Sequence, residues 1–115
     1  MSESQPGTGR MRSILEILES VEGARHTLVL IGELDLSSAP AVQARVAEIV
    51  PQAREIVLDL RELSFMDSSG IRAILVSEEL CARSRCELAL LPGRPNVQRL
   101  FEVSGLTDLL PFIEP

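Results

Sequence analysis

The stretch EIVLDLRELSFMDSSGIRAIL (residues 55–75) decides the fold, because it joins a buried strand to an amphipathic helix. Residues 55–60 (EIVLDL) are mainly aliphatic and β-branched, which is typical of a buried strand. Ile71 and Ile74 then recur at the spacing of one helical face. The short polar segment before them, residues 67–70, predicts a strand-to-helix turn.

Two strands are expected before this stretch. The apolar residues between positions 11 and 22 alternate along the chain and end at Gly23, which predicts an edge strand leading into a hairpin. Residues 27–34 (TLVLIGEL) predict a strand that is buried on both faces and ends at Asp35.

Two more helices and one more strand complete the pattern. One helix is expected to begin at an N-cap in residues 37–38 and to end at Pro51. Residues 86–91 (CELALL) predict a third buried strand. The apolar spacing in residues 97–103 predicts a final helix that Gly105 ends, and the apolar residues after it are expected to fold back.

Strands that alternate with helices form βαβ units, whose strands are parallel. We therefore predict an α/β fold with a mixed sheet of four to five strands, an N-terminal hairpin, parallel central strands and helices packed against the sheet. Residues 1–10 are small and polar and are broken by Pro and Gly, so they are expected to form a flexible tail. Residues 11–115 are expected to form one domain.

Composition excludes several classes of function. The chain has 115 residues and a formal net charge of −6, and all eleven of its basic residues are Arg. The absence of Lys excludes a Schiff-base lysine and a Walker-type phosphate loop. The acidic balance and the presence of only three Phe argue against nucleic acid as a partner. The single imidazole, His26, is expected at the surface. One His and two Cys make a structural zinc site improbable, and one His without any Lys leaves few groups for general acid–base catalysis.

The cysteines and the apolar runs indicate where the protein acts. Cys81 and Cys86 fit neither a redox C-x-x-C motif nor a zinc knuckle, so they are expected to be reduced, buried thiols. The apolar runs are far shorter than the roughly 20 residues that span a bilayer. We expect a cytoplasmic protein with no cofactor and no membrane partner.

The turn at Asp67 and Ser68 carries the chemistry. A side chain at a helix start can cap the free backbone N–H groups there, and either residue could be that N-cap. The same position tolerates a phosphate, because the helix dipole places partial positive charge there. A hydrolase nucleophile elbow, G-x-S-x-G, does not match, because Met66 replaces the first Gly and His26 lies upstream.

Three short motifs in order carry a family resemblance: GELD at residues 32–35, FMDSSG at residues 65–70 and FEVSGL at residues 101–106. With them, the chain resembles the anti-sigma factor antagonists, small proteins built from a single STAS domain. The resemblance covers nearly all of residues 11–115.

The resemblance implies partner switching. In that family the unphosphorylated antagonist binds an anti-sigma factor, itself a serine kinase, and so frees the sigma factor for transcription. The kinase then phosphorylates the first Ser of the turn, here Ser68, which breaks the complex, and a serine phosphatase resets it. The expected partner-binding residues are Asp35, Ser37, Asp67, Ser69, Gly70 and Ile71.

Several of these residues also have a purely structural interpretation. Asp35 suits a turn at a strand end, and Ser69 suits hydrogen bonding at a helix start. Gly70 either lets the partner approach closely or only relieves crowding in the first helical turn. Ile71 begins the apolar stripe of its helix and is assigned to the core in preference to the partner surface.

Two other functional classes compete with this one. A STAS domain can also act as the docking subunit of a transporter ATPase in lipid trafficking, a role that needs no phosphate. An enzyme is the third class, and the missing Lys and the single His count against it. We expect a non-enzymatic regulator that is a monomer or a weak dimer.

Overall fold

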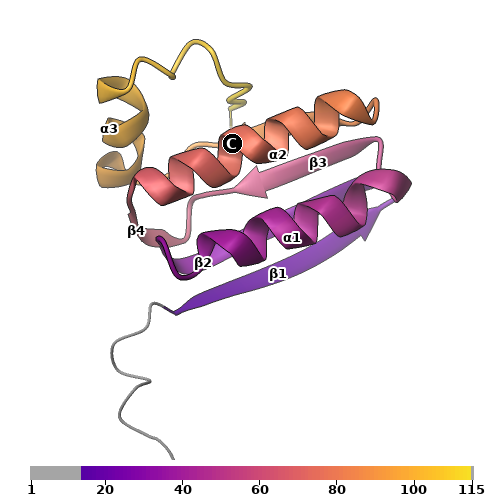
Figure 1. Ribbon diagram of the computed structural model, residues 1–115, viewed down its shortest axis with the longest axis horizontal. Coiled ribbons are helices and arrows are strands. Elements are labelled where there is room, and N and C mark those ends of the chain that lie inside the picture. Colours follow the sequence, from indigo (N-terminus) through magenta and orange to yellow (C-terminus); the bar gives the residue numbers. More distant parts are fainter. Residues whose placement is uncertain (1–13, 115) are drawn as a thin grey trace, which may run out of the picture.

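The computed structural model describes residues 14–114, which form a mixed five-stranded sheet with three α-helices (Figure 1). The elements in chain order are β1 (Leu15–Glu22), β2 (Arg25–Leu34), α1 (Ala39–Ile49), the short 3₁₀ helix η2 (Val50–Gln52), β3 (Glu55–Asp59), β4 (Leu63–Met66), α2 (Ser68–Arg83), β5 (Glu87–Leu91) and α3 (Pro95–Val103). The predicted fold class is confirmed. The predicted tail, residues 1–10, lies outside the described residues.

The sheet combines one hairpin with a parallel core. β1 and β2 are antiparallel and close at the pair Glu22↔Arg25, as expected for a hairpin at Gly23. β2, β3 and β5 follow one another in parallel, and β4 also pairs in parallel with β2. The carboxyl ends of the four parallel strands therefore share one edge of the sheet.

β4 is a strand that the sequence did not predict. β3 pairs only with the first half of β2, from Arg25 to Val29. β4 continues at the same side of β2, where Gly32 pairs with Leu63 and Leu34 with Met66. With four residues, of which the middle two are exposed, β4 lacks the apolar run that marked the other strands.

The two long helices lie side by side over the same face of the sheet (Figure 1). β2 accordingly has one fully buried side, with Leu28 and Leu30 at 0% exposure, while Val29 and Ile31 on its other side are only half-buried. The expectation that this strand is buried on both faces is wrong, because both α1 and α2 cover the same side.

His26 is buried, which corrects the expectation of a surface histidine. The residue is 8% exposed, and its Nδ1 lies 3.2 Å from a carboxylate oxygen of Glu19 on the neighbouring strand. Arg45 of α1 donates to the other oxygen of Glu19 through its Nε, at 3.1 Å. The hydrogen bond from Arg45 holds the pKa of Glu19 below its usual value, and the contact from His26 adds to it. This cluster ties α1 to the hairpin.

The C-terminal residues fold back, as predicted. Phe112 pairs in parallel with Leu90 of β5, and its ring meets Phe101 of α3 edge to face, with centroids 5.0 Å apart. Cys81 and Cys86 are free and buried, as expected. Burial and the nearby Cys86 raise the pKa of the Cys81 thiol to about 12. In residues 14–114 no helix is long and apolar enough to cross a membrane.

Gly32 is the glycine that the sheet requires, and its replacement gives a stability test. Its φ of +113° is one that other residues avoid, and an added Cβ would collide with the carbonyl oxygen of Ile14. Gly23 has a φ of +62° with open space around it. We expect Gly32→Ala to lower the free energy of unfolding by about 2–3 kcal/mol and Gly23→Ala by about 1 kcal/mol. Equal losses in urea titrations would contradict this account.

Candidate functional site

The β2–β4 pairing brings the two sequence motifs together. Leu34 and Met66 are paired in parallel, so the residues that follow them, Asp35 and Asp67, leave the sheet side by side. The backbone N–H of Asp67 donates to the carbonyl of Leu34 at 3.2 Å. The GELD and DSSG turns thus form one surface at the carboxyl edge of the sheet, where α/β proteins place their binding sites.

Asp67 is the N-cap of α2. Its backbone is extended, and its carboxylate accepts a hydrogen bond of 2.8 Å from the N–H of Ser69. Its carbonyl accepts the N–H of Gly70 at 2.9 Å, the first bond of the helix. Of the two capping candidates in this turn, the structure therefore selects Asp67.

Ser68, the first residue of α2, is exposed. Because Asp67 does the capping, the hydroxyl of Ser68 is not needed for the helix start. No hydrogen bond joins that hydroxyl to another residue in the described part of the chain. An accessible hydroxyl at a helix N-terminus can accept a phosphate without loss of a structural bond.

The Asp35 turn lies beside it and is held by its own hydrogen bonds. One carboxylate oxygen of Asp35 accepts both the N–H and the hydroxyl of Ser37 at 3.0 Å each. Ser38 is the N-cap residue of α1, within the predicted pair 37–38. Its hydroxyl donates to the carbonyl of Glu33 at 2.8 Å and accepts the N–H of Asp35 at 3.0 Å. The side chain of Ser38 therefore holds the turn that precedes it, at Glu33 and Asp35. The helix α1 begins without a side-chain hydrogen bond to its first turn.

The remaining predicted residues form the floor of this surface. Ser69 is half-buried, and Ile71 is 8% exposed and belongs to the core, as preferred from its spacing. Gly70 is buried: a Cβ there would lie 2.9 Å from the sulfur of Met66 and 3.0 Å from Leu34. Packing alone thus requires glycine at this position.

Two exposed apolar side chains beside the turns were missed by the sequence reasoning. Leu36 is 77% exposed, and it stands between Asp35 and Ser37 at the tip of the turn. Phe65 of β4 is 46% exposed. The only sequence signal for Leu36 is a large apolar residue inside a polar turn with no helical or strand spacing to its neighbours. Single exposed apolar side chains are common on protein surfaces, so it is the place of these two beside the turns that matters here.

Asp59, at the end of β3, is the buried carboxylate of this edge. Its side chain is 6% exposed and accepts from the Arg61 guanidinium at 2.9 and 3.0 Å and from the Arg61 N–H at 3.0 Å. Burial alone would raise the pKa of Asp59, but the Arg61 hydrogen bonds and charge outweigh burial and lower it. The Asp59–Arg61 ion pair, called the Asp59–Arg61 clamp below, stabilises the turn after β3.

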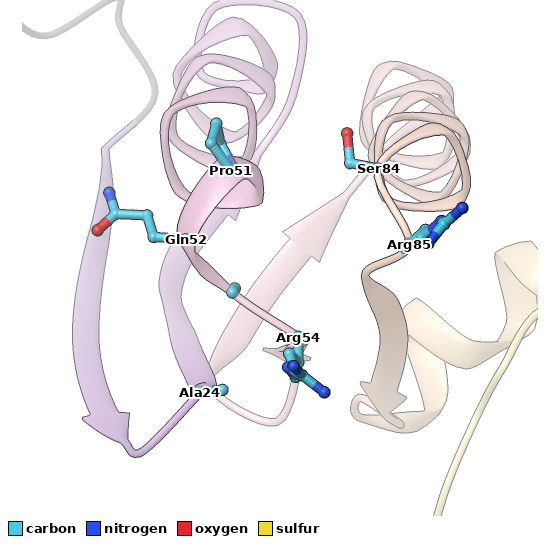
Figure 2. A pocket seen from close by; sticks show the side chains of 7 residues that line it. Ala24, Pro51, Gln52, Arg54, Ser84 and Arg85 are labelled. Atoms are coloured by element: carbon cyan, nitrogen blue, oxygen red, sulfur yellow. The ribbon is translucent and has the colours of Figure 1, made fainter.

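A hollow of about 450 Å³ lies at the opposite end of the sheet, between η2, the end of α2 and the start of β3 (Figure 2). No carboxylate, thiol or imidazole lines it. Arg54 and Arg85 border it, but Figure 2 shows their side chains pointing apart. The carboxyl ends of η2 and α2 meet there. The carboxyl end of a helix carries partial negative charge, which disfavours anions. Within residues 14–114 no set of side chains is arranged to hold a metal ion.

Comparisons with known proteins identify the family of this chain. The family model described as "Mlab, STAS domain" matches residues 17–111. The chain is 36% identical over 100 residues to an anti-sigma F factor antagonist of Paenibacillus polymyxa, which covers 82% of this chain and 86% of that relative. It is 33% identical to an anti-sigma-B factor antagonist of Listeria monocytogenes, over 72% of this chain and 74% of the relative. Among solved structures, unphosphorylated SpoIIAA has a TM-score of 0.75 at 25% identity, covering 89% of this chain and 88% of its own.

The Asp67 cap gives a direct test of the turn. Asp67→Ala removes the acceptor for the Ser69 N–H, and we expect it to lower the free energy of unfolding by about 1 kcal/mol. Asp67→Asn keeps an acceptor oxygen and should lose less than half of that. Urea titration measures both. A full loss in the Asn variant would show that charge, not capping, holds the turn.

The Asp59–Arg61 clamp predicts a dependence of stability on pH. A carboxyl whose pKa is lowered by folding stabilises the protein above its unfolded pKa of about 3.9 and loses that effect as pH falls through its folded pKa. We expect Asp59→Asn to cost about 1–3 kcal/mol of unfolding free energy at pH 7. The difference from the unmodified protein should shrink steadily below about pH 4. A constant difference between pH 7 and pH 3 would contradict the lowered pKa.

Proposed function

The chain belongs to the STAS-domain family of anti-sigma factor antagonists, and we propose that it works as a phosphorylation-controlled partner switch. Its unphosphorylated form binds an anti-sigma factor in the cytoplasm and releases the sigma factor. The anti-sigma factor acts as a serine kinase on Ser68, and a serine phosphatase restores the binding form.

The exposed hydroxyl of Ser68 is the observation that carries this proposal. It stands at the start of a 16-residue helix, on an edge that also presents Asp35 and Ser37. Asp67 and Ser69 complete the proposed contact surface, while Gly70 and Ile71 support it from beneath through packing. The exposed Leu36 supplies an apolar contact that a partner can bury.

A phosphate on Ser68 changes this surface without unfolding it. Phosphoserine carries about −1.5 to −2 charges at neutral pH, and a helix N-terminus stabilises negative charge. The same charge next to the carboxylates of Asp35 and Asp67 repels an acidic partner face and is costly to bury at an interface. Retained fold and lost binding are the two properties that a switch requires.

The alternative of a transporter docking subunit has less support. Docking through the same fold needs no free hydroxyl at Ser68. In this structure Asp67 caps α2, so the hydroxyl of Ser68 is not used for capping. The relatives described above are named as anti-sigma factor antagonists. That family consists of regulatory proteins, not enzymes.

Phosphorylation and binding test the proposal together. Incubation with a cognate anti-sigma kinase and ATP should add one phosphate, which peptide mass spectrometry locates on Ser68. Ser69→Ala, one residue away, should still be labelled, whereas Ser68→Ala should not. In calorimetry, Ser68→Asp should bind the anti-sigma factor at least about tenfold more weakly than Ser68→Ala, a difference of about 1.4 kcal/mol.

Labelling that survives Ser68→Ala would place the phosphate elsewhere and overturn the assignment. Equal affinities of the Asp and Ala variants would contradict release by charge.

A further inference from the structure

Arg72 stands out among the arginines of the described helices because its own helix gives it no carboxylate. Arg45 of α1 pairs with Glu48 at 2.9 Å, and Arg83 of α2 pairs with Glu79 at 2.9 Å. Arg99 of α3 has Glu102 three residues ahead. The helical neighbours of Arg72 three and four residues away are Ser68, Ser69, Leu75 and Val76. No ion pair joins Arg72 to a residue of the described chain.

Arg72 and Ser68 occupy the same exposed stripe of α2. Side chains four residues apart on a helix are neighbours. Both residues are exposed, and so are Leu75 and Glu79 further along the helix. The buried residues Gly70, Ile71, Ala73 and Ile74 turn to the other side of the helix.

We propose that Arg72 is the built-in counter-ion of phosphorylated Ser68, and that this pairing withdraws the Arg72 charge from the partner surface. This inference rests on the proposed function for the modification itself. In the unphosphorylated protein, the Ser68 surface presents the free Arg72 guanidinium to a partner. Position 68, four residues before Arg72, has no carboxylate, and phosphorylation of Ser68 places a negative charge there.

The order of the charges favours the pair. An anion four residues before a cation is the better orientation on a helix. A phosphate on Ser68, the first residue of α2, also suits the helix dipole. A guanidinium can donate two parallel hydrogen bonds to a phosphate. The nearby carboxylates of Asp35 and Asp67 would repel an unpaired phosphate, so the Arg72 charge also offsets that repulsion.

The pairing has a consequence for release from the partner. Before modification, Arg72 is the cation nearest to Ser68 on this stripe, and it can contact an acidic group on the anti-sigma factor. After modification the stripe is net negative, because the phosphate charge exceeds that of one Arg. The partner therefore loses an attractive contact and gains a repulsive one in a single step.

A double-mutant cycle tests the pairing without a kinase or a partner. Phosphoserine is installed at position 68 during protein synthesis, in the unmodified background and in Arg72→Gln. Phosphorylation should raise the thermal midpoint of the Arg72 protein by about 2 °C more than that of Arg72→Gln. In ¹⁵N-labelled protein, the Nε–H resonance of Arg72 should move on phosphorylation.

Arg83→Gln is the matched control. It removes the same charge from the same helix, about 22 Å along the axis from Ser68, and should leave the effect of phosphorylation unchanged. Equal effects of phosphorylation in the Arg72 protein and in Arg72→Gln, with an unmoved Arg72 resonance, would overturn the pairing. That result leaves kinase labelling of Ser68 untouched, whereas unlabelled Ser68 would overturn the proposed function and not the pairing.

Discussion

The parallel pairing of β4 with the end of β2 is the constraint on which the site depends. It sets Leu34 opposite Met66, and the hydrogen bond of 3.2 Å from the Asp67 N–H to the Leu34 carbonyl locks the two turns together. Gly70 lies close to the same two side chains, and Asp67 caps α2 beside them. The position of Ser68 at the helix start is therefore fixed by backbone pairing.

Within this turn the structural roles fall on the residues next to Ser68, the proposed phosphorylation site. Asp67 holds the helix start, Gly70 permits the packing, and Ile71 belongs to the core. Ser68 contributes to none of these tasks. A residue whose side chain makes no structural contact can be modified without loss of the fold. At Ser68, the first residue of α2, the helix dipole favours a negative charge.

Much of the fold followed from local patterns, and the failures were contacts between distant segments. The alternation of apolar strands and helices predicted the βαβ order, and the polar turn pointed to Asp67 and Ser68. β4 was missed because its pairing with β2 is visible only in three dimensions. The burial of His26 was missed because it depends on Glu19 of another strand and on α1 above it. The predicted N-cap position at Ser38 is confirmed, but its hydroxyl bonds to Glu33 and not to the first turn of α1, which the sequence pattern did not indicate.

An NMR titration of the ¹⁵N-labelled protein with its anti-sigma factor tests the central claim, that the joined turns are the partner surface. The account predicts that the amide signals of residues 33–37 and 67–72 shift or broaden first, while those around Arg54 and Arg85 at the opposite end of the sheet stay in place. Perturbations centred on Arg54 and Arg85, with the Ser68 turn unchanged, would contradict it.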